Sequence, residues 1–308
     1  MKIQRSKKNA SIGRKNNTGS LHLMLLPAVI LVFIYHYIPI GGLVMAFQNY
    51  LPALGITGSK WVGLKNFVFL FNMMEFPRAL RNTVWIAGCK IVLNIAVPVV
   101  FALLLNEVRR KALQRGIQTL IYLPHFVSWI LMAGILRDLL SPQAGLINTV
   151  LVKMGFGSIY FLGDNRFFPW VLIFSEIWKE FGYGTIVYLA ALTSIDPTFY
   201  EVAYVDGANR WQQLIHITIP GIAPMIVLMT TLSMGNVLNG GFDQIFNLYA
   251  PVVYETGDIL DTLLYRLGLV SMQFSVSTAA SMMKSIVALI LITVSYRIAY
   301  KTTGYRVL

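Results

Sequence analysis

The sequence predicts an all-α integral membrane protein with six transmembrane helices. Of its 308 residues, 56% are hydrophobic and only 12% are charged, and the mean hydropathy is +0.64. Such a composition is typical of a chain that crosses a bilayer several times, and soluble domains carry more charge. The apolar residues also gather into separate runs, each close to the length of about 20 residues that spans a bilayer.

Six apolar runs are expected to be the membrane helices. They lie at about residues 21–47, 82–105, 117–140, 167–192, 219–238 and 278–300. The first run is too long for a signal-peptide core and has no clear small-x-small cleavage site, so we expect it to be retained. Pro98, Pro124 and Pro224 fall inside or near these runs and predict kinks, which packed neighbouring helices tolerate.

The chain carries a formal net charge of +12, from 25 Lys and Arg against 13 Asp and Glu. A basic excess also occurs in nucleic-acid-binding proteins. Here the basic residues lie beside apolar runs, so the predicted partner is the lipid bilayer and not nucleic acid. Residues 1–19 are rich in Lys and Arg and contain no acid. We interpret them as a cytoplasmic arm next to anionic headgroups.

The distribution of charge predicts the orientation. The connection at 107–116 holds four Lys or Arg and one acid, whereas the connection at 239–277 holds four acids and only Arg266. Cytoplasmic connections are enriched in Lys and Arg. We therefore expect a multi-pass cell-membrane protein with both termini in the cytoplasm, a six-helix domain at 20–300 and a cytoplasmic tail at 301–308.

The loop at 194–220, between the fourth and fifth runs, is predicted to be a short cytoplasmic helix–turn–helix. Pro197 suits the first turn of a helix, where its missing N–H is not needed. Gly207 follows where that helix ends, because glycine adopts the left-handed conformation without strain. A second helical run, from Arg210 to Ile217, leads to Pro220 near the start of the next apolar run. An ordinary connecting loop is the alternative interpretation.

Two short patterns in this loop resemble a known motif. They read E-x-A-x-x-D-G-A and, eight residues later, I-x-I-P. The spacing is similar to the cytoplasmic coupling motif of binding-protein-dependent ABC importer permeases, usually written EAA, G and LP. Val202 and Ile219 depart from that motif, both conservatively. The resemblance implies a coupling helix that contacts an ATPase through Glu201, Ala203, Asp206, Gly207, Ala208, Ile217 and Pro220.

The resemblance extends over nearly the whole chain. Four segments resemble LplB-like polysaccharide permeases: NEVRRKALQRGIQTLIYLPHFVSWILMAGILRDLLSPQAGLIN, IWKEFGYGTIVYLAALTSIDPTFYEVAYVDGANR, GGFDQIFNLYAPVV and DILDTLLYRLGL. This implies the six-helix ABC importer permease fold and import of an oligosaccharide or polysaccharide fragment. The implied partners are an ATPase dimer that carries ATP and Mg, an extracellular sugar-binding lipoprotein and a second permease. A heterodimer with a related chain is favoured over a homodimer.

Catalytic and metal-binding patterns are missing from the sequence. It contains no G-x-x-x-x-G-K-[ST], so we expect no ATP site on this chain. Its four histidines are scattered without the spacing of metal ligands, and its one cysteine, Cys89, excludes an intrachain disulfide. Glu176 and Glu180 are four residues apart with Lys179 between them and no nucleophile nearby. The sequence therefore predicts a protein that is not an enzyme.

The fourth run carries the best candidates for the substrate pathway. Glu176, Lys179, Glu180 and Tyr183 share one helix face, and Trp178 offers an aromatic surface for sugar rings. Ionisable groups at membrane depth usually face protein or water. Further candidates at the outer end of the fifth run are Asn236, Asn239, Asp243 and Gln244. Pairing of Lys179 with its neighbouring glutamates, which would only hold helices together, remains an open alternative.

Other interpretations of the charged residues follow from the same positions. Lys90 and Lys284 are each alone in a predicted helix, so we expect them to snorkel or to pair across helices. An ion-coupled secondary transporter of a sugar or polar solute could use Glu176, Lys179 and Glu180 as a relay. Such a transporter does not need the loop around Gly207. A membrane enzyme that acts on glycans or lipids is a weaker third alternative.

Overall fold

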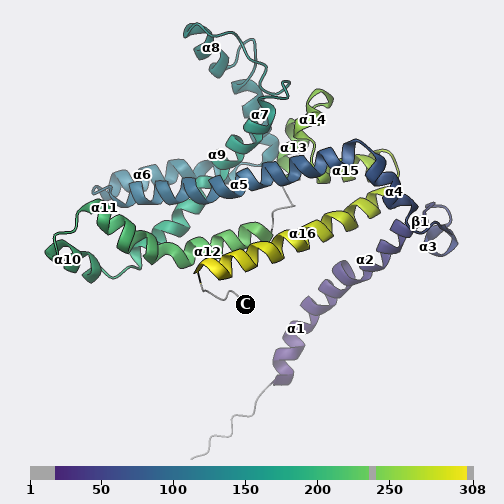
Figure 1. Cartoon of the computed structure of the whole chain (residues 1–308), viewed down its shortest axis with the longest axis horizontal. Helices are drawn as coiled ribbons and strands as arrows, with labels where there is room; N and C mark the ends of the chain where they lie inside the picture. Colours follow the sequence, from purple (N-terminus) through teal and green to yellow (C-terminus); the bar gives the residue numbers. More distant parts are fainter. Residues whose placement is uncertain (1–17, 236–240, 304–308) are drawn as a thin grey trace, which may run out of the picture.

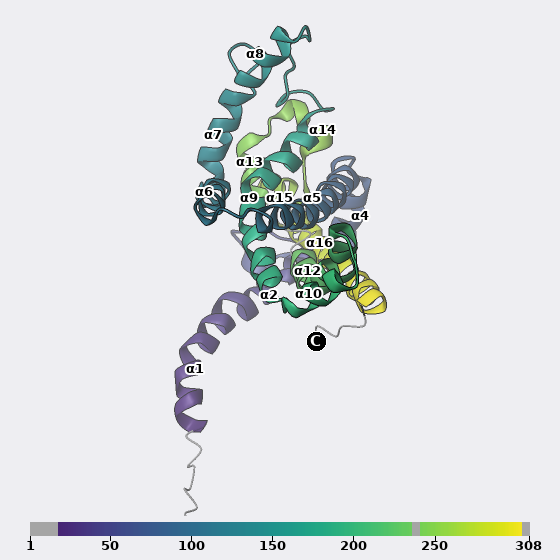
Figure 2. The same cartoon turned by 90° about the vertical axis from the view of Figure 1, so that its left-hand side faces the viewer.

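Long helices that pack against one another form the body of the protein (Figure 1). The computed structural model describes residues 18–235 and 241–303, and these are almost entirely helical. The long helices of the body are α5 (Glu75–Asn106), α9 (Phe168–Thr193), α12 (Ile219–Gly235) and α16 (Phe274–Thr303). In Figures 1 and 2, α7 and α8 project from this body together.

The remaining elements are shorter. The first helical stretch consists of α1 (Thr18–Val32), a π-helical turn (Phe33–Tyr37), α2 (Ile38–Ile40) and a 3-10 segment (Gly41–Phe47). An antiparallel pair of strands and two helices follow as β1 (Gln48–Asn49), α3 (Gly55–Gly58), β2 (Lys60–Trp61) and α4 (Lys65–Asn72). The middle of the chain adds α6 (Lys111–Tyr122), a 3-10 turn (Leu123–Phe126), α7 (Trp129–Leu139) and α8 (Leu146–Lys153).

Two groups of short elements flank α12. Before it come α10 (Thr198–Val205), α11 (Arg210–Gln213) and a π-helical segment (Leu214–Thr218). After it come α13 (Phe242–Leu248), a 3-10 turn (Pro251–Val253), α14 (Tyr254–Gly257), α15 (Leu260–Tyr265) and a π-helical segment (Arg266–Val270). The first group forms the loop with the predicted motif, and the second forms the connection at the opposite end of the body (Figure 1).

Helices α5 and α9 form the centre of the apolar core. One buried cluster joins them to α7 and α13, a second joins α5 to α4, α15 and α16, and a third joins both to α12. Gly182 lets α9 approach α6, because a Cβ at this position would clash with the carbonyl oxygen of Ile121. Small residues allow such close approach of helices in a bilayer, where packing drives their association.

The first predicted span is present but lies apart from the body. Residues His22–Phe47 form one helical stretch of 26 residues, none of it buried over its most apolar window. In Figures 1 and 2 its N-terminal part points away from the other helices. Its C-terminal segment, Gly41–Phe47, packs against α16, and just beyond it the backbone N–H of Tyr50 donates to the Ser275 hydroxyl at 2.8 Å.

The number of spans stays a prediction. Among the described residues, three helical stretches are long and apolar enough to cross a membrane: His22–Phe47, Glu75–Asn106 and Arg210–Ser233. A fourth is present if the bent pair Lys111–Phe126 and Trp129–Leu139 counts as one span. Helix α9 has 26 residues, but it carries three ionisable side chains in its middle. What the structure establishes is a mostly helical fold with several helices of membrane-spanning length.

The chain breaks more sharply within 117–140 than the kink that Pro124 predicts. The chain bends there by 105° between α6 with its 3-10 turn and α7. Pro124 lies in that turn, and the next residues, Val127 and Ser128, have extended backbone angles. The Ser128 hydroxyl then caps α7 by accepting from the N–H of Leu131 at 3.4 Å. A new helix therefore starts in a new direction after the proline turn, instead of the old one continuing with a kink.

Candidate functional site

The first helix of the loop at 194–220 starts where the sequence predicted. Pro197 directly precedes α10, and the backbone N–H of Thr198 donates to Asp196 Oδ1 at 2.9 Å. This hydrogen bond stabilises the carboxylate and lowers the pKa of Asp196 below its usual value. The side chain of Asp196 thus forms a turn with the backbone two residues later, directly before the helix starts.

The turn after α10 is a Schellman motif centred on Gly207. Gly207 has a φ of +77°. Its N–H donates to the carbonyl of Tyr204 at 3.1 Å, and the N–H of Ala208 donates to the carbonyl of Ala203 at 2.9 Å. These two bonds satisfy carbonyls that the helix end would otherwise leave unpaired. The predicted sharp turn is therefore present, with glycine at the position that needs it.

The second arm of the loop begins at Arg210, where the sequence predicted a second helical run. Asn209 and Gln212 form a capping box at its start, with bonds of 2.8 and 2.9 Å between side chains and backbone. The helix then continues through a π-helical segment into α12, so that Arg210–Ser233 is one stretch. Pro220 is the second residue of α12, and the helical stretch continues through it.

Five of the seven predicted coupling residues surround one hollow of about 380 Å³. They are Ala203, Asp206, Gly207, Ala208 and Ile217. The two arms are held together across the loop by a hydrogen bond of 2.9 Å between the hydroxyls of Tyr200 and Thr218. Glu201 and Pro220 are exposed and lie outside the lining of the hollow. The loop is thus a small preformed unit with its own internal packing.

Sequence reasoning missed the exposed apolar side chains of this loop. Tyr204, Val205 and Trp211 are 79%, 84% and 68% exposed, and Phe199 and Val202 are exposed as well. Exposed apolar patches of this kind are typical of surfaces that contact another protein, a membrane or a ligand. The signal in the sequence is the group of large apolar residues in a loop outside the apolar runs.

A salt bridge joins this loop to the neighbouring connection. Arg210 lies 3.0 Å from Glu107, which caps the C-terminal end of α5. Both side chains are largely exposed, so the pair contributes at most about 1 kcal/mol to stability. It does show that the loop and the Arg-rich connection at 107–116 lie at the same end of the body.

The ionisable residues of α9 form two separate pairs. Lys90 of α5 lies 3.6 Å from Glu176, which is the pairing across helices expected for Lys90. Lys179 is buried and lies 3.0 Å from Glu180, and it also donates to the carbonyl of His125 at 2.7 Å. Lys284, the other lone lysine, pairs with Asp261. The pairing of Lys179 with a neighbouring glutamate, expected as an alternative, is therefore present, and its partner is Glu180 and not Glu176.

One side of α9 still presents polar and aromatic groups. The Nδ1 atom of His125 lies 2.7 Å from Glu180 Oε2, and the His125 ring stacks on Tyr183 with centroids 4.8 Å apart. His125 and Glu180 are each about 30% exposed, and Tyr183 is half exposed. These three residues form a part-exposed polar cluster. His125 has no acidic or basic neighbour within several residues in the sequence, so its contact with Glu180 could not be predicted from spacing.

The predicted residues after the fifth run divide into three cases. Gln244 is fully buried, accepts from Lys90 at 2.5 Å and donates to Leu172 O and Ser175 Oγ at 2.7 and 2.8 Å. Its amide is therefore already occupied by protein groups. Asp243 is exposed at the start of α13. Asn236 and Asn239 lie outside the described residues.

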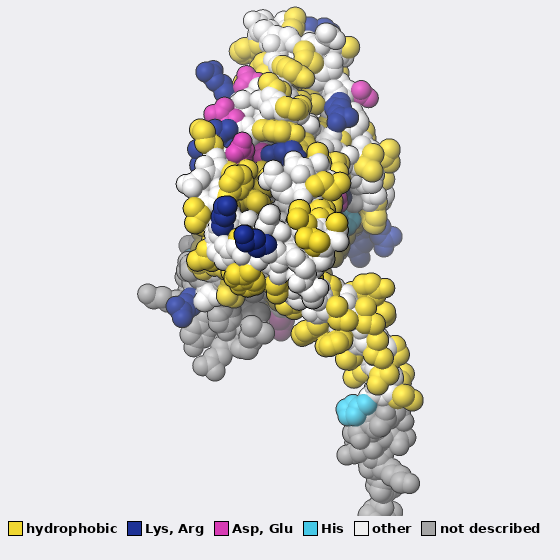
Figure 3. Space-filling model, turned by 90° about the vertical axis from the view of Figure 1, so that its right-hand side faces the viewer, with side chains coloured by type: hydrophobic (Ala, Val, Ile, Leu, Met, Phe, Trp, Pro, Cys, Tyr) yellow, Lys and Arg dark blue, Asp and Glu magenta, His cyan; other side chains and the backbone are white. Residues whose placement is uncertain are grey.

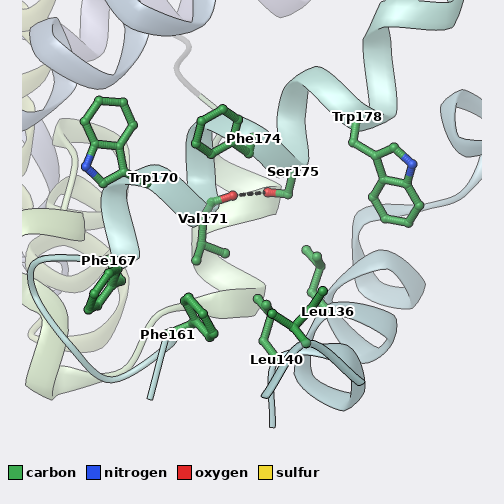
Figure 4. Close-up of a pocket in the computed structure, with 10 residues that line it drawn as sticks. Leu136, Leu140, Phe161, Phe167, Trp170, Val171, Phe174, Ser175 and Trp178 are labelled. Atoms are coloured by element: carbon green, nitrogen blue, oxygen red, sulfur yellow. Dashed lines mark hydrogen bonds between the residues drawn. The ribbon is translucent and has the colours of Figure 1, made fainter. Parts of the chain in front are cut away.

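Trp178 contributes to an apolar hollow of about 520 Å³ between α7 and α9 (Figure 4). Trp170 and Phe174 lie along the same side of α9, and Leu136 and Leu140 face them from α7 and its C-terminal end. The hydroxyl of Ser175 donates to the carbonyl of Val171 at 2.6 Å. Because the Ser175 hydroxyl is already bonded within the helix, the lining is better suited to contact an apolar surface than the hydroxyl groups of a sugar. The structure thus places Trp178 on a different side from the polar cluster.

The chain is similar to transport proteins of known type. Residues 94–302 match the family "Binding-protein-dependent transport system inner membrane component". In Bacillus subtilis (strain 168), the polygalacturonan/rhamnogalacturonan transport system permease protein YteP is 43% identical over 91% of this chain and 88% of its own. Protein LplB of the same organism is 39% identical with the same coverage.

Solved structures agree with this assignment. A crystal structure of a bacterial ABC transporter involved in the import of the acidic polysaccharide alginate superposes with a TM-score of 0.86. It is 39% identical, and the match covers 93% of this chain and 97% of that one. The family excludes the alternatives of a secondary transporter and a membrane enzyme. This chain belongs to the binding-protein-dependent inner membrane components, and it is a non-catalytic permease subunit of an ABC importer.

Proposed function

We propose that this permease imports an oligosaccharide or a fragment of a polysaccharide. The observation that carries the proposal is the identity of 43% over 91% of the chain with a polygalacturonan/rhamnogalacturonan permease. The alginate importer, at 39% identity, supports the same substrate class. Uptake of labelled oligogalacturonate and of a neutral oligosaccharide of equal length by cells that express the whole importer tests it. If the cells take up neither sugar, the proposal is contradicted.

The proposed assembly contains more than this chain. A related second permease completes the pathway, and an ATPase dimer binds ATP and Mg, whose hydrolysis drives the transport. A secreted sugar-binding lipoprotein delivers the substrate at the opposite face. A relative solved with an oligosaccharide-bound periplasmic protein supports this last partner. Co-purification of the tagged chain with copies of itself alone would contradict the heterodimer.

We also propose that the chain has six spans with both termini in the cytoplasm, from the domain limits predicted above. The salt bridge between Arg210 and Glu107 supports this orientation, because it brings the coupling loop beside the Arg-rich connection. The acidic connection with α13, α14 and α15 lies towards the other end of α5 (Figure 1). Lys and Arg are enriched on cytoplasmic sides, so the coupling loop faces the ATPase.

Cysteine labelling in intact cells is expected to report this orientation. In a Cys89→Ala background, Lys111→Cys should be protected from a membrane-impermeant thiol reagent, whereas Glu255→Cys should be labelled. Both native side chains are exposed, so burial within the protein does not explain protection. Labelling of both after permeabilisation is the control. Labelling at position 111 in intact cells would overturn the proposed orientation.

Within this assembly we propose two sets of functional residues. Ala203, Asp206, Gly207, Ala208 and Ile217, which line the hollow, give the coupling loop its shape. The exposed apolar residues around the hollow contact the ATPase. Glu201 and Pro220 flank this contact. The polar cluster of α9 lines the substrate pathway, because part-exposed ionisable groups at membrane depth face water or a polar ligand and not lipid.

Replacement of Glu180 is expected to raise the KM for uptake more than it lowers the maximal rate. Glu180→Gln keeps the shape and a hydrogen-bonding oxygen but removes the charge that His125 and Lys179 contact, so we expect a loss of about tenfold in apparent affinity. Trp178→Ala is the matched variant on the apolar side of the same helix and should leave the KM unchanged. Loss of the assembled complex in Glu180→Gln would instead show that the residue only holds helices together.

A further inference from the structure

A second polar hollow, of about 550 Å³, lies where the first helical stretch ends and α16 begins. Its walls come from the two strands, the start of α4 and residues 272–276. The bond between Tyr50 N–H and Ser275 Oγ joins these walls, and the Tyr50 and Phe274 rings meet edge to face at 6.0 Å. The hollow is therefore built by contacts between segments far apart in the sequence.

This hollow is positively charged. Lys60 and Lys65 line it, and no Asp or Glu belongs to its lining. Among the described residues, neither lysine forms an ion pair. Lys65 and Asn66 are also the first residues of α4, whose N-terminus has no side-chain cap. The two ammonium groups attract negative charge, and the positive end of the helix dipole of α4 adds to this attraction.

An apolar face of α4 lies next to the positively charged hollow. Val68, Phe69 and Phe71 of α4 are exposed, and Trp61 beside Lys60 is 61% exposed. Figure 3 shows basic side chains among hydrophobic ones on the side of the molecule that holds the strands and α4. Lys beside Trp, Tyr and Phe at the end of a span is the pattern of residues that sit at headgroup level in a bilayer.

We propose that this hollow binds the phosphodiester headgroup of an anionic phospholipid, and that the acyl chains lie along the apolar face of α4. A carboxylate from a docked protein would also attract Lys60 and Lys65. It would not account for an apolar helix face beside the ends of two apolar stretches, whereas a lipid fits both surfaces at once. With the orientation proposed above, this lipid belongs to the outer leaflet. The inference does not depend on the transported substrate.

Quenching of Trp61 fluorescence by brominated lipids tests the proposal. The purified importer complex is placed in nanodiscs with brominated phosphatidylglycerol or brominated phosphatidylcholine at equal density. The same complex with Trp61→Phe is subtracted to remove the signal of other tryptophans. We expect Trp61-specific quenching to be stronger with phosphatidylglycerol than with phosphatidylcholine. Replacing Lys60 or Lys65 by Gln should reduce this preference roughly fivefold for each lysine.

Matched variants make the result decisive. Lys153→Gln removes an exposed lysine from α8, away from the hollow, and should keep the preference. Thermal unfolding of each complex verifies that the variants are folded. Equal quenching by the two lipids would overturn the proposal. An unchanged preference for phosphatidylglycerol in the variant Lys60→Gln/Lys65→Gln would overturn it as well. If that variant then bound the secreted sugar-binding protein less well, the hollow would be identified as a protein contact.

Discussion

Replacing Gly207 by Asp is expected to abolish uptake, although the chain should still insert and the complex should still form. No heavy atom of the chain itself lies within 4 Å of a Cβ at this position. A Cβ therefore meets no neighbour inside the permease, and the cost within the chain is the backbone strain of a φ of +77°, about 1 kcal/mol. It adds bulk and charge at the centre of the proposed ATPase contact, beside the exposed side chains of Tyr204 and Val205. Uptake and the stimulation of ATPase activity by loaded binding protein are the two measurements.

A second glycine provides a matched control for this experiment. Gly155 has a φ of +89° and also has open space around a Cβ, but it follows α8 at a distance from the loop. Gly155→Asp introduces the same backbone strain, about 1 kcal/mol, and the same charge. It should therefore leave uptake near normal. Near-normal uptake by Gly207→Asp as well would remove the support for a coupling role of this turn.

Replacing Lys90 by Met is expected to reduce the amount of folded permease strongly. The change leaves the Glu176 carboxylate without its cation, and it removes the donor to the buried Gln244. Loss of one partner of a buried pair costs about 3–5 kcal/mol. The Glu176 side chain is 20% exposed, so we expect a loss near the lower end, about 3 kcal/mol. The measurement is the yield and thermal unfolding of the purified complex.

A double variant separates charge from packing at this pair. Lys90→Met/Glu176→Gln removes both charges, and we expect it to recover most of the stability that Lys90→Met loses, because no unpaired charge is left buried. Glu176→Gln alone should have the smaller effect of the two single changes, since Lys90 keeps its bond to Gln244. A double variant as unstable as Lys90→Met would show that the pair contributes through shape and not through charge.

Local patterns were sufficient for the features that depend on neighbouring residues. The apolar runs predicted the long helices, because about 20 apolar residues have few stable alternatives to a membrane helix. Pro197 and Gly207 predicted the start and end of α10, because the backbone angles of proline and glycine act within one turn. The motif around Gly207 also predicted the family, which the matches to other permeases confirmed.

Features that depend on distant segments could not be predicted in this way. Spacing along α9 allowed Lys179 to pair with either glutamate, and the choice depended on His125 and on Lys90, which come from other segments. The bend of 105° before α7 was predicted only as a kink, because Pro124 marks a break in the helix but not the direction in which the next helix leaves it. Local sequence determines which groups are available, but a charge takes the partner that the packing of other helices brings within reach of it.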